Sequence, residues 1–124
     1  MLQVGKTATV STVVSEKNTA KAVGSGSIEV FSTPMMIALM EQAACECLAS
    51  GLEAGQTSVG TSVNVEHKEA SPVGAEVRAN ATIENIEGRK IFFSVYASCA
   101  EKEIGSGTHT RVIINVEKFM GRFK

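Results

Sequence analysis

The sequence predicts an α+β domain in which an antiparallel β-sheet wraps around one long central helix. One segment carries apolar residues at helical spacing, β-branched segments flank it on both sides, and the later segments are joined by short connections. The chain has 124 residues, of which 44% are apolar. This is enough for one small hydrophobic core, so we expect a single domain over residues 1–124.

The N-terminal third contains a strand and a loop. Residues 7–14, TATVSTVV, are rich in β-branched side chains and predict a strand. Residues 17–27 are polar and rich in glycine and serine, which favours a mobile loop. A short extended piece at 28–31 is expected to lead into the helix.

The long helix is predicted in the segment STPMMIALMEQAACECLASG, residues 32–51. Thr33 is suited to cap it, Pro34 fits its first turn and Gly51 fits its C-terminal end. Helical spacing places six apolar residues on one face, and we expect this face to be buried. They are Met36, Leu39, Met40, Ala43, Cys47 and Leu48.

Four strands are predicted after the helix, at about 57–68, 75–86, 90–100 and 104–117. Their short connections indicate antiparallel hairpins in a meander. One helix cannot cover both faces of such a sheet, and its edges stay open. We therefore expect a homodimer or a dimer of dimers.

Composition excludes several classes of function. A net charge of −1 argues against partners held mainly by charge, such as nucleic acid or an anionic membrane. No apolar run is long enough to span a bilayer, and the alternating N-terminus does not resemble a signal peptide, so we expect a cytoplasmic protein. The spacing of histidine, cysteine and carboxylate residues predicts no metal site and no cofactor.

Two titratable residues stand in apolar places. Glu41 lies at the margin of the buried helix face, where a carboxylate needs a partner unless it extends into solvent. His67 continues the face of Val59 and Val63 in the first long strand, whereas Gly60 lies on the opposite face by strict alternation. His67 is either a core or interface histidine, or it meets Glu41 as an acid–base pair.

Thr33 is eight residues before Glu41, about 12 Å along a regular helix. Three arrangements would allow both to act on one substrate: an irregular chain at Pro34, a substrate lying between them, or sites completed across a dimer interface. Among weaker candidates, His109 and Arg111 are interpreted as an exposed strand pair. All three cysteines, Cys45, Cys47 and Cys99, are interpreted as structural thiols.

The chain resembles hotdog-fold acyl-CoA thioesterases of the fluoroacetyl-CoA thioesterase type over nearly its whole length. The motifs that carry the resemblance are FSTP (31–34), VGTSVNVEH (59–67), PVG (72–74) and GSGTHTRVIINVEKF (105–119). The resemblance implies hydrolysis of an acyl-CoA thioester by a Thr/Glu/His constellation. Matched by position, these residues are Thr33, Glu41 and His67, and Gly60 is implied to lie beside the thioester carbonyl.

The resemblance also implies roles. His67 would activate water or handle protons on the departing thiolate, Glu41 would act as nucleophile or general base, and Thr33 would orient the carboxylate or bind the carbonyl. Residues 17–30, near the implied acyl pocket, hold no aromatic side chain, so we expect a different or broader acyl group than fluoroacetyl. Candidate partners for the CoA phosphates are Lys68, Arg78, Arg89 and Lys90.

Two other functions compete with thioester hydrolysis. The first is a non-catalytic acyl-CoA-binding module on the same fold. It would keep the groove but would not need both Glu41 and His67. The second is a hydratase or dehydratase on the hotdog scaffold, although the FSTP and VEH motifs do not resemble that family.

Overall fold

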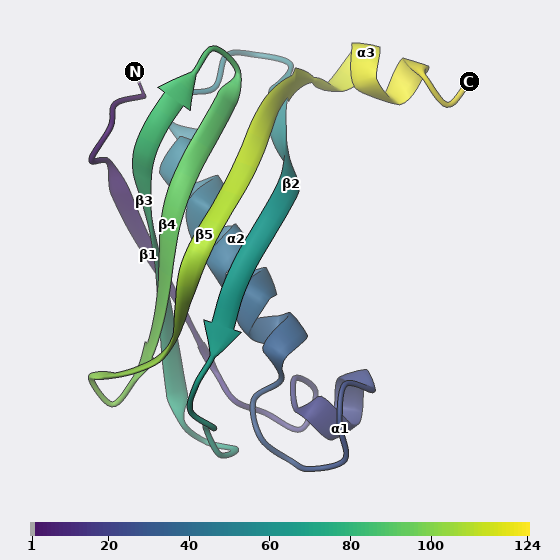
Figure 1. Ribbon diagram of the computed structural model, residues 1–124. Coiled ribbons are helices and arrows are strands. Elements are labelled where there is room, and N and C mark those ends of the chain that lie inside the picture. The colour runs from purple at the N-terminus through teal and green to yellow at the C-terminus, as the bar shows by residue number, and fades with distance from the viewer. Residues whose placement is uncertain (1) are drawn as a thin grey trace.

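The computed structural model describes residues 2–124 as one curved sheet with a long helix lying against its inner face (Figure 1). The predicted α+β class is confirmed. In chain order the elements are β1 (Thr7–Val13), α1 (Ala20–Val23), α2 (Thr33–Ala49), β2 (Gln56–His67), β3 (Glu76–Glu87), β4 (Lys90–Cys99), β5 (Lys102–Asn115) and α3 (Val116–Gly121). No helix among the residues described has the length and apolar character needed to cross a membrane.

The strand order is β1-β3-β4-β5-β2, with every pair antiparallel. The predicted four-strand meander is therefore wrong in its first pairing, because β2 does not pair with β3. Strands β3, β4 and β5 follow one another, but β2 crosses to the far edge and pairs with β5. The link over residues 68–75 is longer than a tight hairpin turn, which permits this crossover.

Glycine makes the close pairing of β2 with β5 possible. A Cβ atom at Gly107 would collide with the carbonyl oxygen of Asn64 and come within 2.7 Å of the Cα of Val65. A Cβ atom at Gly105 would lie 2.6 Å from the sulfur of Met36 on α2. These two positions let helix, β2 and β5 meet without gaps.

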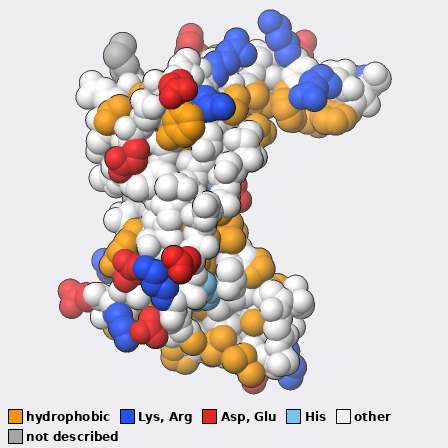
Figure 2. Space-filling view, viewed as in Figure 1, with side chains coloured by type: hydrophobic (Ala, Val, Ile, Leu, Met, Phe, Trp, Pro, Cys, Tyr) orange, Lys and Arg blue, Asp and Glu red, His pale blue; other side chains and the backbone are white. Residues whose placement is uncertain are grey.

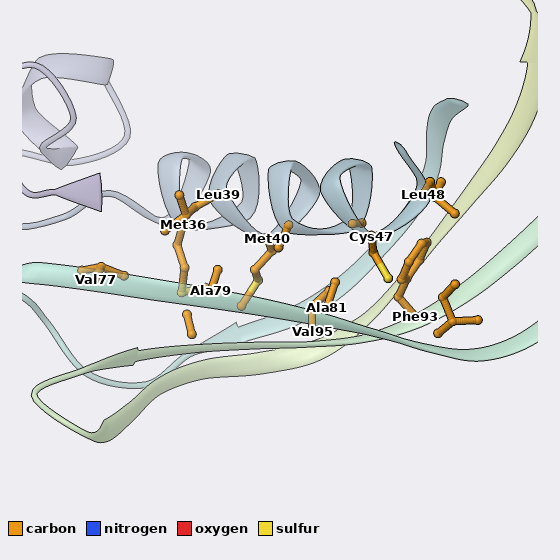
Figure 3. Close-up of a cluster of buried hydrophobic side chains, with 14 of the residues drawn as sticks. Met36, Leu39, Met40, Cys47, Leu48, Val77, Ala79, Ala81, Phe93 and Val95 are labelled. Carbon is orange, nitrogen blue, oxygen red and sulfur yellow. The ribbon is translucent and has the colours of Figure 1, made fainter. Parts of the chain in front are cut away.

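The predicted buried face of the helix is confirmed. All six of its apolar residues are buried against the sheet, where they meet Val77, Ala79, Ala81 and Phe93 (Figure 3). The predicted N-cap is wrong by one residue, whereas Gly51 directly follows the C-cap, Ser50, as expected for the C-terminal end. Ser32 is the N-cap, because its hydroxyl oxygen accepts from the Met35 N–H at 3.2 Å, and Ser50 ends the helix in a right-handed conformation.

Two short helices were missed by the sequence analysis. Helix α1 lies in the segment predicted as a loop, with Thr19 as its N-cap and Gly24 as its left-handed C-cap. Helix α3 begins at Val116, inside the range predicted for the last strand, because the side chain of Asn115 caps it. Apolar residues continue into this segment, so no local signal marks the end of the strand.

Candidate active site

Thr33 and His67 meet where α2 begins and β2 ends. The hydroxyl of Thr33 lies 2.8 Å from Nδ1 of His67. Because Ser32 caps the helix, the Thr33 hydroxyl is free to make this contact. Within this chain Thr33 therefore orients an imidazole, and the carboxylate of Glu41 is not its partner.

The imidazole of His67 has one nitrogen in use and one free. Its Nε2 atom is buried and finds no hydrogen-bond partner within residues 2–124. Burial lowers the pKa of His67, and the nearby backbone of Glu69 acts in the opposite direction. The ring is therefore neutral near pH 7 and has a nitrogen to offer to another group.

A cavity of about 310 Å³ opens beside this pair. Apolar side chains from α1 and from the extended segment before α2 form much of its wall, together with Thr33, His67 and Lys68. The apolar residues are Ala20, Ile28, Val30 and Phe31. A wall of this kind suits an acyl chain next to a reactive polar pair.

Glu41 belongs to a second cluster, farther along α2. Its Oε2 atom lies 2.9 Å from Nη1 of Arg111 and 3.7 Å from Nε2 of His109. The Glu41 side chain is 38% exposed, whereas those of Arg111 and His109 are 8% and 1% exposed. The interpretation of His109 and Arg111 as an exposed strand pair is wrong, because their strand face is turned toward α2.

Arg111 is fixed by contacts on three sides. Its Nε and Nη2 atoms donate to the hydroxyl and the carbonyl of Ser58, at 2.8 and 3.1 Å. Its Nη1 atom lies 3.2 Å from Nε2 of His109 in addition to its contact with Glu41. A buried guanidinium with this many partners holds the carboxylate in one position.

A β-bulge at Thr61 decides which residues of β2 face the helix. The pairing with β5 shifts between Gly60 and Ser62, so Thr61 is an extra residue in β2. Gly60 and His67 therefore lie on the same face, contrary to the strict alternation used in the sequence analysis. A Cβ atom at Gly60 would collide with Oε2 of Glu41 and lie 3.1 Å from Cε1 of His109.

The four residues singled out from the sequence thus form two half-sites in one chain. Thr33 contacts His67, and Gly60 lies against Glu41. No hydrogen bond or ion pair joins Glu41 to His67 among the residues described. Within one chain the histidine beside Glu41 is His109, whereas His67 lies beside Thr33. The predicted meeting of Glu41 with His67 therefore requires a site completed across a dimer interface.

Of the other candidates, Lys68 pairs with Glu103 and Arg78 with Glu76, while Lys90 lies over the ring of Phe92. Figure 2 shows Lys and Arg side chains gathered at the α3 end of the molecule.

None of the three cysteines is in a disulfide: Cys45 is exposed, Cys99 is half-buried, and Cys47 is buried, which raises its pKa. Within residues 2–124, no cluster of three or more His, Cys, Asp or Glu side chains is arranged to hold a metal ion.

Comparisons with known proteins agree with this architecture. A model of the family described as FlK, fluoroacetyl-CoA-specific thioesterase, matches residues 14–117. The fluoroacetyl-CoA thioesterase of Streptantibioticus cattleyicolor is 42% identical over 96 residues, covering 77% of this chain and 69% of that protein.

Solved structures are similar over the whole fold. A mutant of the thioesterase FlK in complex with fluoroacetate and CoA is 37% identical, with a TM-score of 0.90 over 95% of this chain and 99% of that one. A hot-dog-like protein from Thermanaerovibrio acidaminovorans is 25% identical, with a TM-score of 0.89 over 98% and 90% of the two chains. The expected hotdog fold is thereby confirmed.

Proposed function

This chain belongs to the fluoroacetyl-CoA-specific thioesterase family, and we propose that it hydrolyses a small or medium acyl-CoA thioester to the free acid and CoA. One observation carries the proposal. Glu41 is a half-exposed carboxylate that a buried arginine holds in place beside Gly60, a position with no side chain. A half-exposed carboxylate that is held in one position is suited to attack a thioester or to activate water.

We further propose that a second copy of the chain completes each site. Strand β2 is at the edge of the sheet, and Val63 near its middle is 38% exposed. Figure 2 shows a hollow along this flank, between α3 and the α1 end of the molecule. Long unpaired edge strands of this kind are commonly covered by another chain.

The bulge supports one register for this pairing. Since Thr61 is the extra residue, Gly60 and His67 lie at equal distances on either side of Asn64, counted in paired positions along β2. Two β2 strands that run antiparallel about a two-fold axis at Asn64 would put Gly60 opposite the partner's His67. Glu41 of one protomer would then face the partner's Thr33 and His67.

The proposed reaction uses these groups in turn. In one route the carboxylate of Glu41 attacks the thioester carbonyl and expels the CoA thiolate, and a water then hydrolyses the mixed anhydride to the free acid and the Glu41 carboxylate. In the other route Glu41 removes a proton from a water that attacks the carbonyl directly. In both routes the backbone N–H of Gly60 donates to the carbonyl oxygen. The neutral ring of the partner's His67, oriented by the partner's Thr33, receives the proton taken from the water and passes it to the departing thiolate. No resident cofactor is needed, because CoA is part of the substrate.

The acyl group is expected to be apolar and not restricted to fluoroacetyl. The cavity beside His67 is lined by aliphatic side chains and one Phe ring, Phe31, together with polar groups that include Ser25, Lys68 and Glu69. Residues 17–30 hold no aromatic side chain. An aliphatic pocket discriminates weakly between chains that differ by one methylene, so related esters should all be accepted.

Thiol release from a panel of acyl-CoA esters tests the activity. The panel runs from acetyl and fluoroacetyl to medium-chain and aromatic groups, with the wild type and Glu41→Ala measured side by side. Turnover of at least one ester that the substitution abolishes supports thioester hydrolysis. Esters that protect the protein against thermal unfolding without turnover would instead identify the non-catalytic acyl-CoA-binding module.

Mixing two inactive variants tests the composite site. Glu41→Ala and His67→Ala are unfolded together and refolded as an equimolar mixture. If each site takes Glu41 from one chain and His67 from the other, half of the dimers are mixed and each has one intact site. About a quarter of wild-type activity should return. No recovery from a mixture shown to contain mixed dimers would place both groups in one chain.

The two chemical routes differ in where oxygen from solvent appears. In a single turnover in ¹⁸O-labelled water, label enters the protein carboxylate when water hydrolyses a mixed anhydride at the Glu41 carbonyl. Direct attack by water on the thioester leaves label only in the released acid, as does hydrolysis of the anhydride at the acyl carbonyl, so label in Glu41 identifies the anhydride route.

A further inference from the structure

We propose that His109 is a positioning residue for the hydrolysis: it acts as a neutral imidazole, protonated on Nδ1, that holds Arg111 in the orientation which presents Glu41. The inference rests on the proposed function for its effect on activity, but the state of the ring can be tested without turnover. His109 acts on Glu41 through Arg111, whose Nη1 atom lies 3.2 Å from Nε2 of His109 and 2.9 Å from Oε2 of Glu41.

The hydrogen bonds of His109 define its tautomer. Its Nδ1 atom lies 2.8 Å from the carbonyl oxygen of Ser62. A carbonyl oxygen can only accept, so Nδ1 carries a proton. Burial lowers the pKa of His109, and the charge of Arg111 acts in the same direction, against the Ser62 carbonyl and Glu41, so the ring is neutral and Nε2 keeps its lone pair.

The lone pair on Nε2 of His109 can accept the one N–H of Arg111 that has no other partner, which is on Nη1. The two hydrogens on Nη1 can serve Glu41 Oε2 at 2.9 Å and His109 Nε2 at 3.2 Å, while Nε and Nη2 donate to Ser58. Without an acceptor at Nε2, one Nη1 hydrogen would be buried and unpaired, which is costly enough to rotate the guanidinium. His109 therefore fixes Arg111 on the side that Ser58 leaves open.

The orientation of Arg111 in turn determines the position of the Glu41 carboxylate. Arg111 bonds to Oε2 only, so Oε1 is the oxygen left to face the substrate. A rotation of the guanidinium would move the carboxylate, and misplacement by about 1 Å can cost about a hundredfold in rate.

Among residues 2–124, Glu41 is the one anion near His109. Its charged neighbours are Arg111 on β5 and Glu41 on α2, whereas β4 presents the stacked ring of Phe93 at 6.0 Å and β2 presents the Ser62 carbonyl. Protonation would remove the Nε2 acceptor and place a second cation 3.2 Å from Nη1 of Arg111.

The bulge explains why the Ser62 carbonyl is available. Thr61 interrupts the regular pairing of β2 with β5 next to Ser62. A chain of hydrogen bonds thus runs from the bulge through His109 and Arg111 to Glu41.

Long-range ¹H–¹⁵N spectra of the imidazole rings test the proposed state directly. The chain has only two histidines, so His67→Gln assigns the signals of His109. At pH 7.5 we expect a neutral ring with the proton on Nδ1. A proton on Nε2, or a cationic ring, would overturn the proposal whether or not the protein hydrolyses thioesters.

Two substitutions test the effect on catalysis. His109→Leu fills space but cannot accept from Arg111, and kcat should fall by about tenfold to a hundredfold with KM changed by less than about threefold. His109→Gln can donate to Ser62 and accept from Arg111, and should keep kcat within about fivefold of the wild type.

Equal losses in His109→Leu and His109→Gln, with both variants folded by circular dichroism, would show that only packing matters and would refute the positioning role. Absence of turnover in the wild type would refute the proposed function and leave the result for the tautomer standing.

Discussion

The two half-sites of this chain differ in how complete they are. The Glu41 half-site is a closed network in which Arg111, His109 and Ser58 satisfy one another below a single half-exposed carboxylate. The Thr33–His67 half-site is one hydrogen bond beside an open cavity, with a buried ring nitrogen that has no partner within residues 2–124.

The difference suggests that the two regions tolerate change differently. In the closed network, removing any member leaves another buried polar group unpaired, so effects should spread through the cluster. At the open half-site, a substitution removes the catalytic group that it replaces but leaves no other buried polar group unpaired. The following predictions test this comparison, from the largest expected effect to the smallest.

Replacing the carboxylate should give the largest loss. Glu41→Gln keeps the size of the side chain but removes the nucleophile or base, and kcat should fall by about 10²–10⁴-fold. Thiol release measured with the best ester of the panel checks this. Glu46→Gln, an exposed position on the same helix, is the matched control and should keep full activity.

At the open half-site, substitution of the histidine should cost more activity than substitution of the threonine. His67→Gln removes the proton donor and should cost about 10²-fold or more. Thr33→Val removes one hydrogen bond of about 1 kcal/mol net, so a loss of about fivefold is expected. Steady-state kinetics of the two variants, with the exposed Thr57→Val as control, measure the ratio of their activity losses. A Thr33→Val loss as large as that of His67→Gln would mean that Thr33 itself contacts the reacting group.

Adding one methyl group at Gly60 should disturb the closed network. In Gly60→Ala the new Cβ collides with Oε2 of Glu41 and must push the carboxylate aside, so kcat should fall by about tenfold to a hundredfold. Gly121→Ala is the control, since a Cβ atom there meets nothing within 4 Å. Unchanged kcat in Gly60→Ala would show that the carboxylate is free to move without loss.

The smallest effect concerns pH and stability. The pKa values of His67 and His109 are both lowered in the folded protein, so the unfolded chain binds more protons just below its own histidine pKa of about 6.5. Stability should therefore be full above about pH 6.5 and decline as the pH falls toward the folded pKa values. Thermal melts from pH 8 to pH 5 should show Tm falling by a few degrees.

His109→Gln should flatten that decline more than His67→Gln, since His109 is the more deeply buried of the two rings. A larger flattening by His67→Gln would reverse the comparison between the half-sites.

Much of the fold could be predicted from the sequence because its signals are local. The apolar stripe of α2 follows from spacing alone, and all six of its residues are buried. The crossover of β2 could not be predicted, because strand pairing depends on contacts between residues far apart in the chain. The β5 glycines that admit β2 have this meaning only once the partner strand is known.

The same limit explains the candidate site. Glu41 at the margin of the helix face and His67 on an apolar strand face are anomalies that a pattern reveals. Arg111 and His109 alternate normally in β5, and nothing in the local sequence distinguishes a buried pair from an exposed one. Their burial is a property of the helix that covers them.

The extra residue at Thr61 also bears on how this site can change in evolution. In a regular strand, gaining or losing one residue turns every later side chain to the other face, but a bulge absorbs the extra residue. Deleting Thr61 would leave Gly60 and His67 on the same face, because the remaining residues would alternate regularly against the same β5 partners, and it would remove only the distortion beside Ser62. Related sequences should therefore be compared here by the length of this strand as well as by identity, since the length indicates whether the bulge that serves His109 is present.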